Sequence, residues 1–214
     1  GGPNGTFNEW RFFNGVPTPT SLTLEHIDEL GGPDSYNHYN TGWAWAFDTP
    51  FPYWKRWAGY EGGIADMCLV SWPAKVAADT AVRSQYVHAV DVVPTIYDLI
   101  GITPPATLNG HQQRPIEGES FAASLTTPDA PEKRTQFYAM LGTRGMWEDG
   151  WLAAAVHAPF NGKGNFDKDQ WQLYHVDVDR SESTDLAKQH PEKLAALKKA
   201  WDEEARINLA LPLD

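Results

Sequence analysis

The sequence has a single cysteine, Cys68, among its 214 residues, and this excludes a disulfide framework within the chain. No apolar run approaches the roughly 20 residues that a membrane-spanning helix needs. Basic residues are also few: 17 Lys and Arg stand against 28 Asp and Glu, which gives a net charge of −11. Because binding to nucleic acid and to anionic membranes depends on clustered Lys and Arg, neither is expected as a partner. An anionic substrate would need a local cation or a metal.

Aromatic residues, in contrast, are concentrated in one region, residues 33–63. Pro50, Pro52 and Gly59 interrupt this stretch, and no regular hydrophobic period runs through it. A long aromatic loop of this kind either packs against a larger body or lines a site. The aromatic side chains in question are Trp43, Trp45, Phe47, Phe51, Tyr53, Trp54, Trp57 and Tyr60.

Two apolar segments predict strands. Residues 65–72 (ADMCLVSW) form a short apolar run that ends at Pro73, which is typical of a buried strand. Residues 86–90 are a second extended candidate. Because Cys68 lies inside the first segment with apolar neighbours, we expect it to be a buried structural residue rather than a reactive thiol.

Helix signals are clear at two places. For residues 92–100, Asp91 provides an N-terminal cap, Pro94 lies in the first turn and Gly101 follows the last residue, and together these predict a helix of about three turns. A shorter helix is predicted for residues 21–30, because two glycines follow it.

The pattern changes after residues 126–135, where prolines and polar residues cluster and indicate a boundary. Asp149-Gly150 between two apolar runs is a strong hairpin signal. Residues 136–214 therefore predict a small antiparallel sheet covered by one helix at residues 191–208. The expected strands are residues 136–141, 144–147, 151–157 and 171–178. The expected buried face of the helix consists of Leu194, Leu197, Trp201 and Ala205.

Four segments, in this order, form a recognisable set of motifs. The first is YWKRW at residues 53–57, followed by YEGG at 60–63 and by a strand ending in Trp72-Pro73. The others are VDVVPTIYDLIG at 90–101, then LNG through GES at 108–120, then LYHVD at 173–177 with its acidic tail to 187. Together they span nearly the whole chain.

These motifs resemble those of the sulfatase family, arylsulfatase type, within the alkaline-phosphatase-like superfamily. The resemblance implies an α/β fold, in which residues 1–130 are the C-terminal portion of the catalytic domain and contribute to a mostly parallel sheet with helices. Residues 131–214 would be the small C-terminal antiparallel sheet plus helix. Because Gly1 opens on what looks like the middle of a loop, we expect a fragment whose missing N-terminal part belongs to the same polypeptide.

The resemblance also implies sulfate-ester hydrolysis by covalent catalysis, with a formylglycine nucleophile and a divalent cation, Ca²⁺ in most relatives. The nucleophile is made in a C/S-x-P-S-R motif, and Cys68 lacks the Pro, Ser and Arg that would follow it. The nearest match to the family's Asp-Asn-Gly metal turn is at Asn4, which has no acidic neighbour. We therefore expect the formylglycine and the metal site upstream of Gly1, no metal ligand in this chain, and no activity of the fragment alone.

Lys55 is the residue that the resemblance places in contact with the substrate's sulfate group, because it lies just ahead of the Gly-Gly turn. From local sequence alone it would be a surface lysine whose stem lies on Trp rings. His38, Tyr39, Trp43 and Trp45 either line the substrate entrance, where an aryl group stacks on indole, or pack the loop onto the body. Asp66 stands where the family usually has an arginine, which puts that arginine's role in doubt.

The triplet formed by His175, Asp177 and Asp179 could suggest a metal site, but its position in the fourth motif favours a structural role. Two other functions remain open. One is a phosphatase or phosphonate hydrolase of the same superfamily. The other is a non-catalytic module that binds carbohydrate or aryl groups through its aromatic-rich loop, and binding by the isolated chain without metal would favour it.

Overall fold

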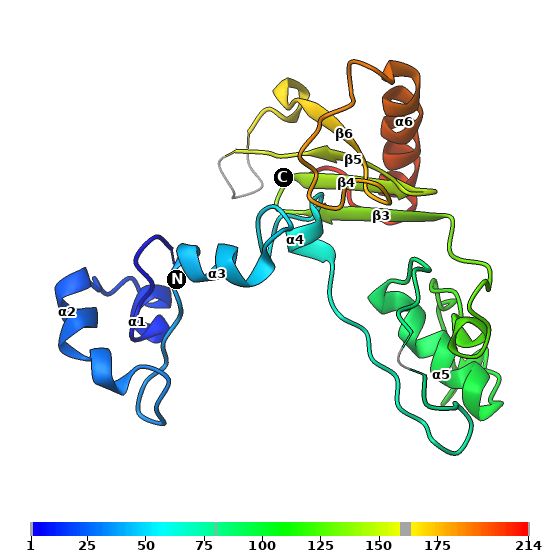
Figure 1. The fold of residues 1–214 in the computed structure, drawn as a ribbon, viewed down its shortest axis with the longest axis horizontal. Coiled ribbons are helices and arrows are strands. Elements are labelled where there is room, and N and C mark those ends of the chain that lie inside the picture. The colour runs from blue at the N-terminus through cyan, green and yellow to red at the C-terminus, as the bar shows by residue number, and fades with distance from the viewer. Residues whose placement is uncertain (1, 80, 159–163, 214) are drawn as a thin grey trace. The chain divides into compact units, whose positions relative to one another are not determined.

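The computed structural model describes residues 2–79, 81–158 and 164–213 (Figure 1). The chain forms two compact units. The first combines Gly1–Ala65 with Phe137–Asp214, and the second is Asp66–Gln136. The predicted division into two sulfatase domains at residue 130 stays a prediction. Within the first unit, residues 51–61 contact the C-terminal sheet and the turn that follows β6 (Trp171–His175).

The C-terminal sheet of the first unit is a four-stranded antiparallel meander. Its order is β3-β4-β5-β6. Asp149 and Gly150 join β4 to β5 with φ values of 47° and 79°, the left-handed pair that a two-residue hairpin requires. The register places Met146 opposite Ala153, and Ala153 opposite Leu173. The predicted sheet is thus confirmed, with strands β3 Thr135–Met140, β4 Thr143–Glu148, β5 Trp151–Ala155 and β6 Trp171–His175.

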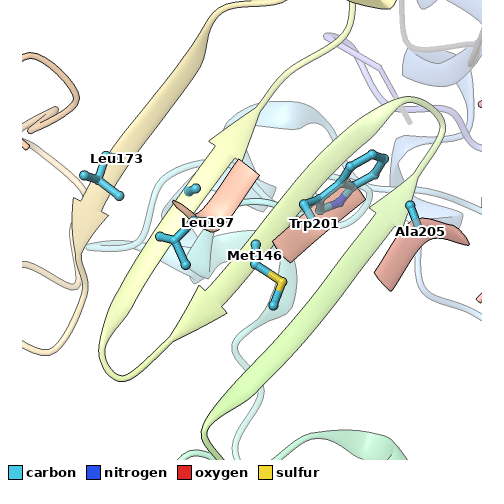
Figure 2. Packing of buried hydrophobic residues seen from close by; sticks show 6 residues of the cluster. Met146, Leu173, Leu197, Trp201 and Ala205 are labelled. Atoms are coloured by element: carbon cyan, nitrogen blue, oxygen red, sulfur yellow. The ribbon is translucent and has the colours of Figure 1, made fainter. Parts of the chain in front are cut away.

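Helix α6 (Pro191–Ile207) covers one face of this sheet (Figure 1). Its face at Leu197, Trp201 and Ala205 is buried as predicted, and Leu194 packs against the edge of the same cluster. The Trp201 indole N–H also donates a 2.9 Å hydrogen bond to the backbone oxygen of Tyr138. Figure 2 shows how the helix residues meet the strands in a single core, which consists of Met146, Ala153, Leu173, Leu197, Trp201 and Ala205.

The N-terminal part of the first unit consists of short helices. The predicted helix at residues 21–30 is formed by α2 (Thr20–Glu25) and the 3-10 turn η1 (Ile27–Glu29). Inside the aromatic stretch lies a helix that we did not expect, α3 (Thr41–Asp48), whose first turn is capped by the Asn40 side chain, which accepts the Trp43 N–H at 3.0 Å. The remaining short elements of the unit are α1 (Glu9–Phe13), α4 (Glu61–Ile64) and η4 (Phe166–Lys168).

The second unit is built around α5 (Val92–Ile100), which has the predicted bounds and Gly101 in the left-handed conformation after its last residue. The predicted N-terminal cap is wrong, because the Asp91 side chain makes no capping bond to α5 and instead accepts the N–H groups of His88 and Glu119. Its other elements are η2 (Ala89–Asp91), β1 (Thr107–Leu108), β2 (His111–Gln112) and η3 (Ala122–Leu125). β1 and β2 pair as a small antiparallel hairpin. The predicted α/β class is therefore confirmed as a mixed α/β fold with small antiparallel sheets.

Asp91 is the central polar residue of the second unit. It is almost fully buried, and one carboxylate oxygen accepts hydrogen bonds from the Lys133 ammonium and the Glu119 N–H, both at 2.8 Å. The other oxygen accepts the N–H of His88 at 2.8 Å. Burial opposes ionisation, but the bonds from Lys133 and from the two N–H groups outweigh it and lower the pKa of Asp91. The motif aspartate therefore ties its own segment to two distant ones, at Glu119 and Lys133.

The predicted strands at residues 65–72 and 86–90 are wrong for this chain. Neither segment forms a ladder, and Met67 and Leu69 have 90% and 81% of their surface exposed. Cys68 is also exposed, contrary to our expectation of a buried residue. A strand buries both faces only when neighbouring strands and covering helices are present. In the part of the chain that the structure describes, both named sheets are antiparallel, so the expected share of a parallel sheet is not formed there.

We expect Leu197→Ala to lower the free energy of unfolding of the first unit by about 2 to 4 kcal/mol, because Leu197 is fully buried and its truncation leaves a cavity. Urea unfolding of the full chain, followed by far-UV circular dichroism, measures the change. Ile207→Ala is the matched control, since Ile207 lies at the end of the same helix with 72% of its surface exposed. Equal effects of the two substitutions would contradict this account of the core.

We expect Asp91→Asn to destabilise the second unit by about 3 kcal/mol, because it leaves the buried Lys133 ammonium without its charge partner. Since the folded pKa of Asp91 is lowered, its contribution is present above the ordinary carboxyl pKa of about 4 and is lost as pH falls further. Hydrogen exchange of residues 92–101, measured by mass spectrometry, reports the loss. Asp129→Asn, at an exposed position of the same unit, should leave exchange unchanged.

Candidate functional site

Lys55 lies in a tight loop of the first unit, residues 50–63, which we call the Lys55 loop. The backbone on either side of Lys55 has left-handed φ values at two non-glycine residues, Tyr53 (65°) and Arg56 (85°). Residues other than glycine adopt this region at a cost of about 1 kcal/mol or more, and such strain is concentrated at functional sites. The Lys55 and Arg56 side chains are both exposed at the tip.

The two glycines of the E-G-G motif allow the loop to fold back on itself. A Cβ atom at Gly62 would come within 2.5 Å of the Tyr53 carbonyl oxygen, and one at Gly63 would come within 3.0 Å of the Trp54 carbonyl oxygen. The backbone around Lys55 therefore lies directly on these glycines. This contact explains why the motif needs glycine at both positions.

A second pair of glycines fixes the loop to the C-terminal sheet. A Cβ atom at Gly59 would lie 2.6 Å from the carbonyl oxygen of Arg144, and one at Gly145 would lie 2.8 Å from that of Ala58. The hydroxyl group of the next residue, Tyr60, donates a hydrogen bond to the Gln172 side-chain oxygen on β6. Strands β4 and β6 thus hold the loop in place, through Gly145 and Gln172.

Aromatic stacking completes the loop. Tyr53 stacks on Trp57 with ring centroids 3.9 Å apart, and it meets Tyr60 edge-on at 4.7 Å. Trp54 contacts Trp45 of α3 at 6.5 Å. Such pairs contribute roughly 0.5 to 1.5 kcal/mol each beyond the area they bury. The aromatic residues of the loop therefore act first as its internal packing.

The tip of the loop borders a hollow of about 700 Å³ in the first unit, lined by Lys55, Arg56, Met140 and Leu141. Met140 ends β3, and Leu141 opens the turn to β4 with a φ of 50°. The hollow thus combines two positive charges with two apolar side chains. This combination suits a ligand that has an anionic group at one end and an apolar group at the other.

The structure places the other predicted site residues apart from the hollow. His38 lies 3.7 Å from the Glu9 carboxylate, and the exposed Tyr39 ring lies beside it. Trp43 is exposed on α3, where it stacks on Phe47. Trp45 contacts the Lys55 loop through the Trp54 ring. None of the four lines the hollow, and their role in substrate binding stays a prediction.

A buried acidic pair beneath the loop was not found by sequence reasoning. Glu61 and Glu182 are both buried, and the Glu61 N–H donates to a Glu182 carboxylate oxygen at 2.9 Å. Arg180 donates two hydrogen bonds to one Glu61 oxygen, at 3.1 and 2.7 Å. Burial, followed by the nearby charges of Glu61 and Asp179, raises the pKa of Glu182 to about 8. Both glutamates lie in the quoted motifs, which is the signal that could have revealed them.

The acidic residues of the fourth motif have structural partners. Asp179 accepts the N–H groups of Ser183 and Thr184 at 2.9 and 3.0 Å, and Asp185 accepts those of Leu173 and Ala187 at 3.0 and 2.9 Å. Hydrogen bonds, led by that from the Ser181 hydroxyl, lower the pKa of Asp179. The motif therefore closes a turn around β6.

The described part of the chain contains no cluster of side chains that could bind a metal ion. Across residues 2–79, 81–158 and 164–213, no three His, Cys, Asp or Glu side chains are arranged to hold a metal ion. The Ca²⁺ that the family resemblance implies therefore does not fit these residues. A search of the same residues also finds no helix that is long and apolar enough to cross a membrane.

Comparison with known proteins supports the predicted resemblance. No protein-family model matches the chain. An uncharacterized sulfatase of Schizosaccharomyces pombe is 27% identical over 190 residues, which covers 86% of this chain and 32% of that protein. An arylsulfatase of Klebsiella aerogenes is 26% identical over 96 residues, which covers 45% of this chain and 20% of that protein.

Two solved structures share the fold. One, described in a study of glycosaminoglycan metabolism by Bacteroides thetaiotaomicron, has a TM-score of 0.52 and 21% identity, and the match covers 69% of this chain and 30% of that one. The other, Ps i-CgsB in complex with a neocarrahexaose, has a TM-score of 0.50 and 21% identity, with 72% and 32% covered. The chain spans about a third or less of the length of each of these relatives. The resemblance to the sulfatase family that the four motifs predict is thereby confirmed.

Proposed function

We propose that the chain provides the sulfate-contacting loop, and the sheet that holds it, of a sulfatase-type sulfuric ester hydrolase. The observation that carries the proposal is the Lys55 loop, whose tip bears two adjacent cations on strained backbone above a paired-glycine contact. An acidic chain needs such a local positive charge to attract an anion. The similarity to sulfatases gives the anion its chemical class.

In this proposal the Lys55 ammonium group hydrogen-bonds a sulfate oxygen of the substrate and offsets its negative charge. A charge-assisted hydrogen bond of this type contributes about 1.5 to 3 kcal/mol. Arg56 faces the same hollow and adds to the local positive potential. Met140 and Leu141 contact the apolar part of the alcohol or phenol that leaves. His38, Tyr39, Trp43 and Trp45 are proposed to extend this surface toward the entrance.

The sulfatase resemblance implies that a formylglycine supplies the nucleophile and a divalent cation supplies charge stabilisation at the sulfate. The sequence has no C/S-x-P-S-R motif, and the described residues contain no metal cluster. We propose that both belong to the N-terminal part of the same polypeptide, and that this chain alone does not hydrolyse sulfate esters. The contributions of this chain are then binding, orientation and charge.

The non-catalytic binding module stays as an alternative because several aromatic side chains are exposed. Trp10, Tyr36 and Trp43 are more than half exposed, and the Trp10 and Tyr36 rings stack at 5.7 Å. Exposed aromatic rings of this kind stack well on sugar or aryl faces. Isothermal titration of the isolated chain with an aryl glycoside, in the absence of metal, distinguishes the two functions, since saturable binding would favour the module.

We expect Lys55→Ala, made in a protein that joins this chain to its upstream sulfatase sequence, to lower kcat/KM for 4-nitrophenyl sulfate by roughly 10- to 100-fold. The reason is the loss of one charge-assisted hydrogen bond to the sulfate group. Lys188→Ala is the matched control, because Lys188 is an exposed lysine of the same unit outside the loop. The assay follows release of 4-nitrophenol with and without added Ca²⁺.

Three outcomes of that assay would contradict the proposal. A Lys55→Ala enzyme as active as the Lys188→Ala enzyme would remove Lys55 from the sulfate site. Preference of the unsubstituted protein for 4-nitrophenyl phosphate would favour the phosphatase alternative. Absence of hydrolysis with either ester, from a protein that carries the formylglycine, would exclude this enzymatic function.

A further inference from the structure

We infer that Glu182, acting with Glu61 and Arg180, is a positioning group that holds the Lys55 loop on the C-terminal sheet. This inference deepens the proposed function, because the loop matters for catalysis only if Lys55 contacts the substrate. None of the three residues lines the hollow beside Lys55. Each of them acts through the backbone or the packing of the loop.

The three residues hold both ends of the Lys55 loop. At the C-terminal end, Glu182 accepts the N–H of Glu61 at 2.9 Å, immediately before the glycines on which the loop folds back. At the N-terminal end, the Arg180 guanidinium lies 4.8 Å from the centroid of the Phe51 ring. The same guanidinium donates to the Glu61 carboxylate. Arg180 therefore connects the beginning of the loop to its end.

Glu182 is held rigidly enough to act as an anchor. Its backbone has a left-handed φ of 49°, and its N–H donates to the Asp179 carbonyl oxygen at 3.0 Å. The surrounding turn is closed by the bonds that Asp179 and Asp185 accept, and Asp185 ties the turn to the N–H of Leu173 in β6. The turn that carries Glu182 is thus tied to β6 of the sheet that packs against α6.

The charge around Glu182 makes the anchor sensitive to pH. Its second carboxylate oxygen is buried and has no hydrogen-bond partner among the described residues. The Glu61 and Asp179 carboxylates repel a negative charge there, and the Arg180 cation is already bound to Glu61. The nearby hydroxyls of Tyr60 and Tyr174 stay neutral, because burial and the surrounding carboxylates raise the pKa of each. The neutral form of Glu182 is therefore favoured in the folded chain.

The sign of the pH effect follows from this preference. The folded pKa of Glu182, about 8, lies above the ordinary glutamate value of 4.5, so the folded chain binds more protons than the unfolded chain between these values. The anchor is fully stabilising below about pH 4.5 and loses its contribution as pH rises through about 8. A loosened anchor would let the loop open, and Lys55 would then lose its fixed position.

The test compares Glu182→Gln, Glu182→Ala and the control Glu117→Gln in the full chain. Hydrogen exchange of peptides from residues 50–63 is measured by mass spectrometry from pH 6 to 9 and corrected for the intrinsic pH dependence of exchange. In the unsubstituted chain the corrected rate should rise from pH 6 and level off above about pH 8. Glu182→Gln keeps a neutral acceptor for the Glu61 N–H and should abolish this rise, while Glu182→Ala should exchange roughly tenfold faster at every pH. Glu117→Gln, at an exposed position, should behave as the unsubstituted chain does.

Two results would overturn the inference. One is a Glu182→Gln chain that retains the pH-dependent rise, and the other is a Glu182→Ala chain whose loop is as protected as before. The activity of the extended protein separates this inference from the proposed function. If exchange responds as expected but Lys55→Ala leaves sulfate hydrolysis intact, the positioning role stands and the sulfate role of Lys55 fails. If both hold, Glu182→Gln should move the alkaline limb of kcat/KM to higher pH.

Discussion

The close backbone contact between the Lys55 loop and strand β4 is the constraint on which the site depends. Gly59 and Gly145 meet there without side chains between them, and a Cβ atom on either would come within 2.8 Å of the opposite carbonyl oxygen. A contact this close fixes the height and direction of the loop above the sheet. Met146 of β4 lies in the core between the sheet and α6. The packing of α6 on the C-terminal sheet therefore also fixes the position of Lys55.

This dependence gives the C-terminal sheet a direct part in the site. Gln172 on β6 holds Tyr60, and Glu182 in the turn after β6 holds Glu61. The acidic side chains that support the loop are buried below it, while Lys55 and Arg56 point outward at its tip. A chain with a net charge of −11 can therefore present a local cationic surface at Lys55 and Arg56, while Glu61 and Glu182 are buried.

Sequence reasoning succeeded where the signals are local. The helix that ends before Gly101, the hairpin at Asp149-Gly150 and the buried face of α6 all follow from glycine stop signals, turn residues and periodicity. It failed for residues 65–72, because an apolar run predicts burial only if other strands cover it, and Cys68 is exposed instead. Glu182 could not be found locally, since its partner Glu61 lies 121 positions earlier in the chain.

Buried carboxylates that accept backbone N–H groups recur in both units, and their neighbours decide how each responds to pH. Asp91 has the Lys133 ammonium on its own oxygen, so its charge is stabilised and its pKa is lowered. The Arg180 guanidinium is bound to Glu61 and not to Glu182, so burial prevails and the pKa of Glu182 is raised. The same device therefore weakens in acid in the second unit and weakens as pH rises toward about 8 in the first, so the two units respond to pH in opposite directions.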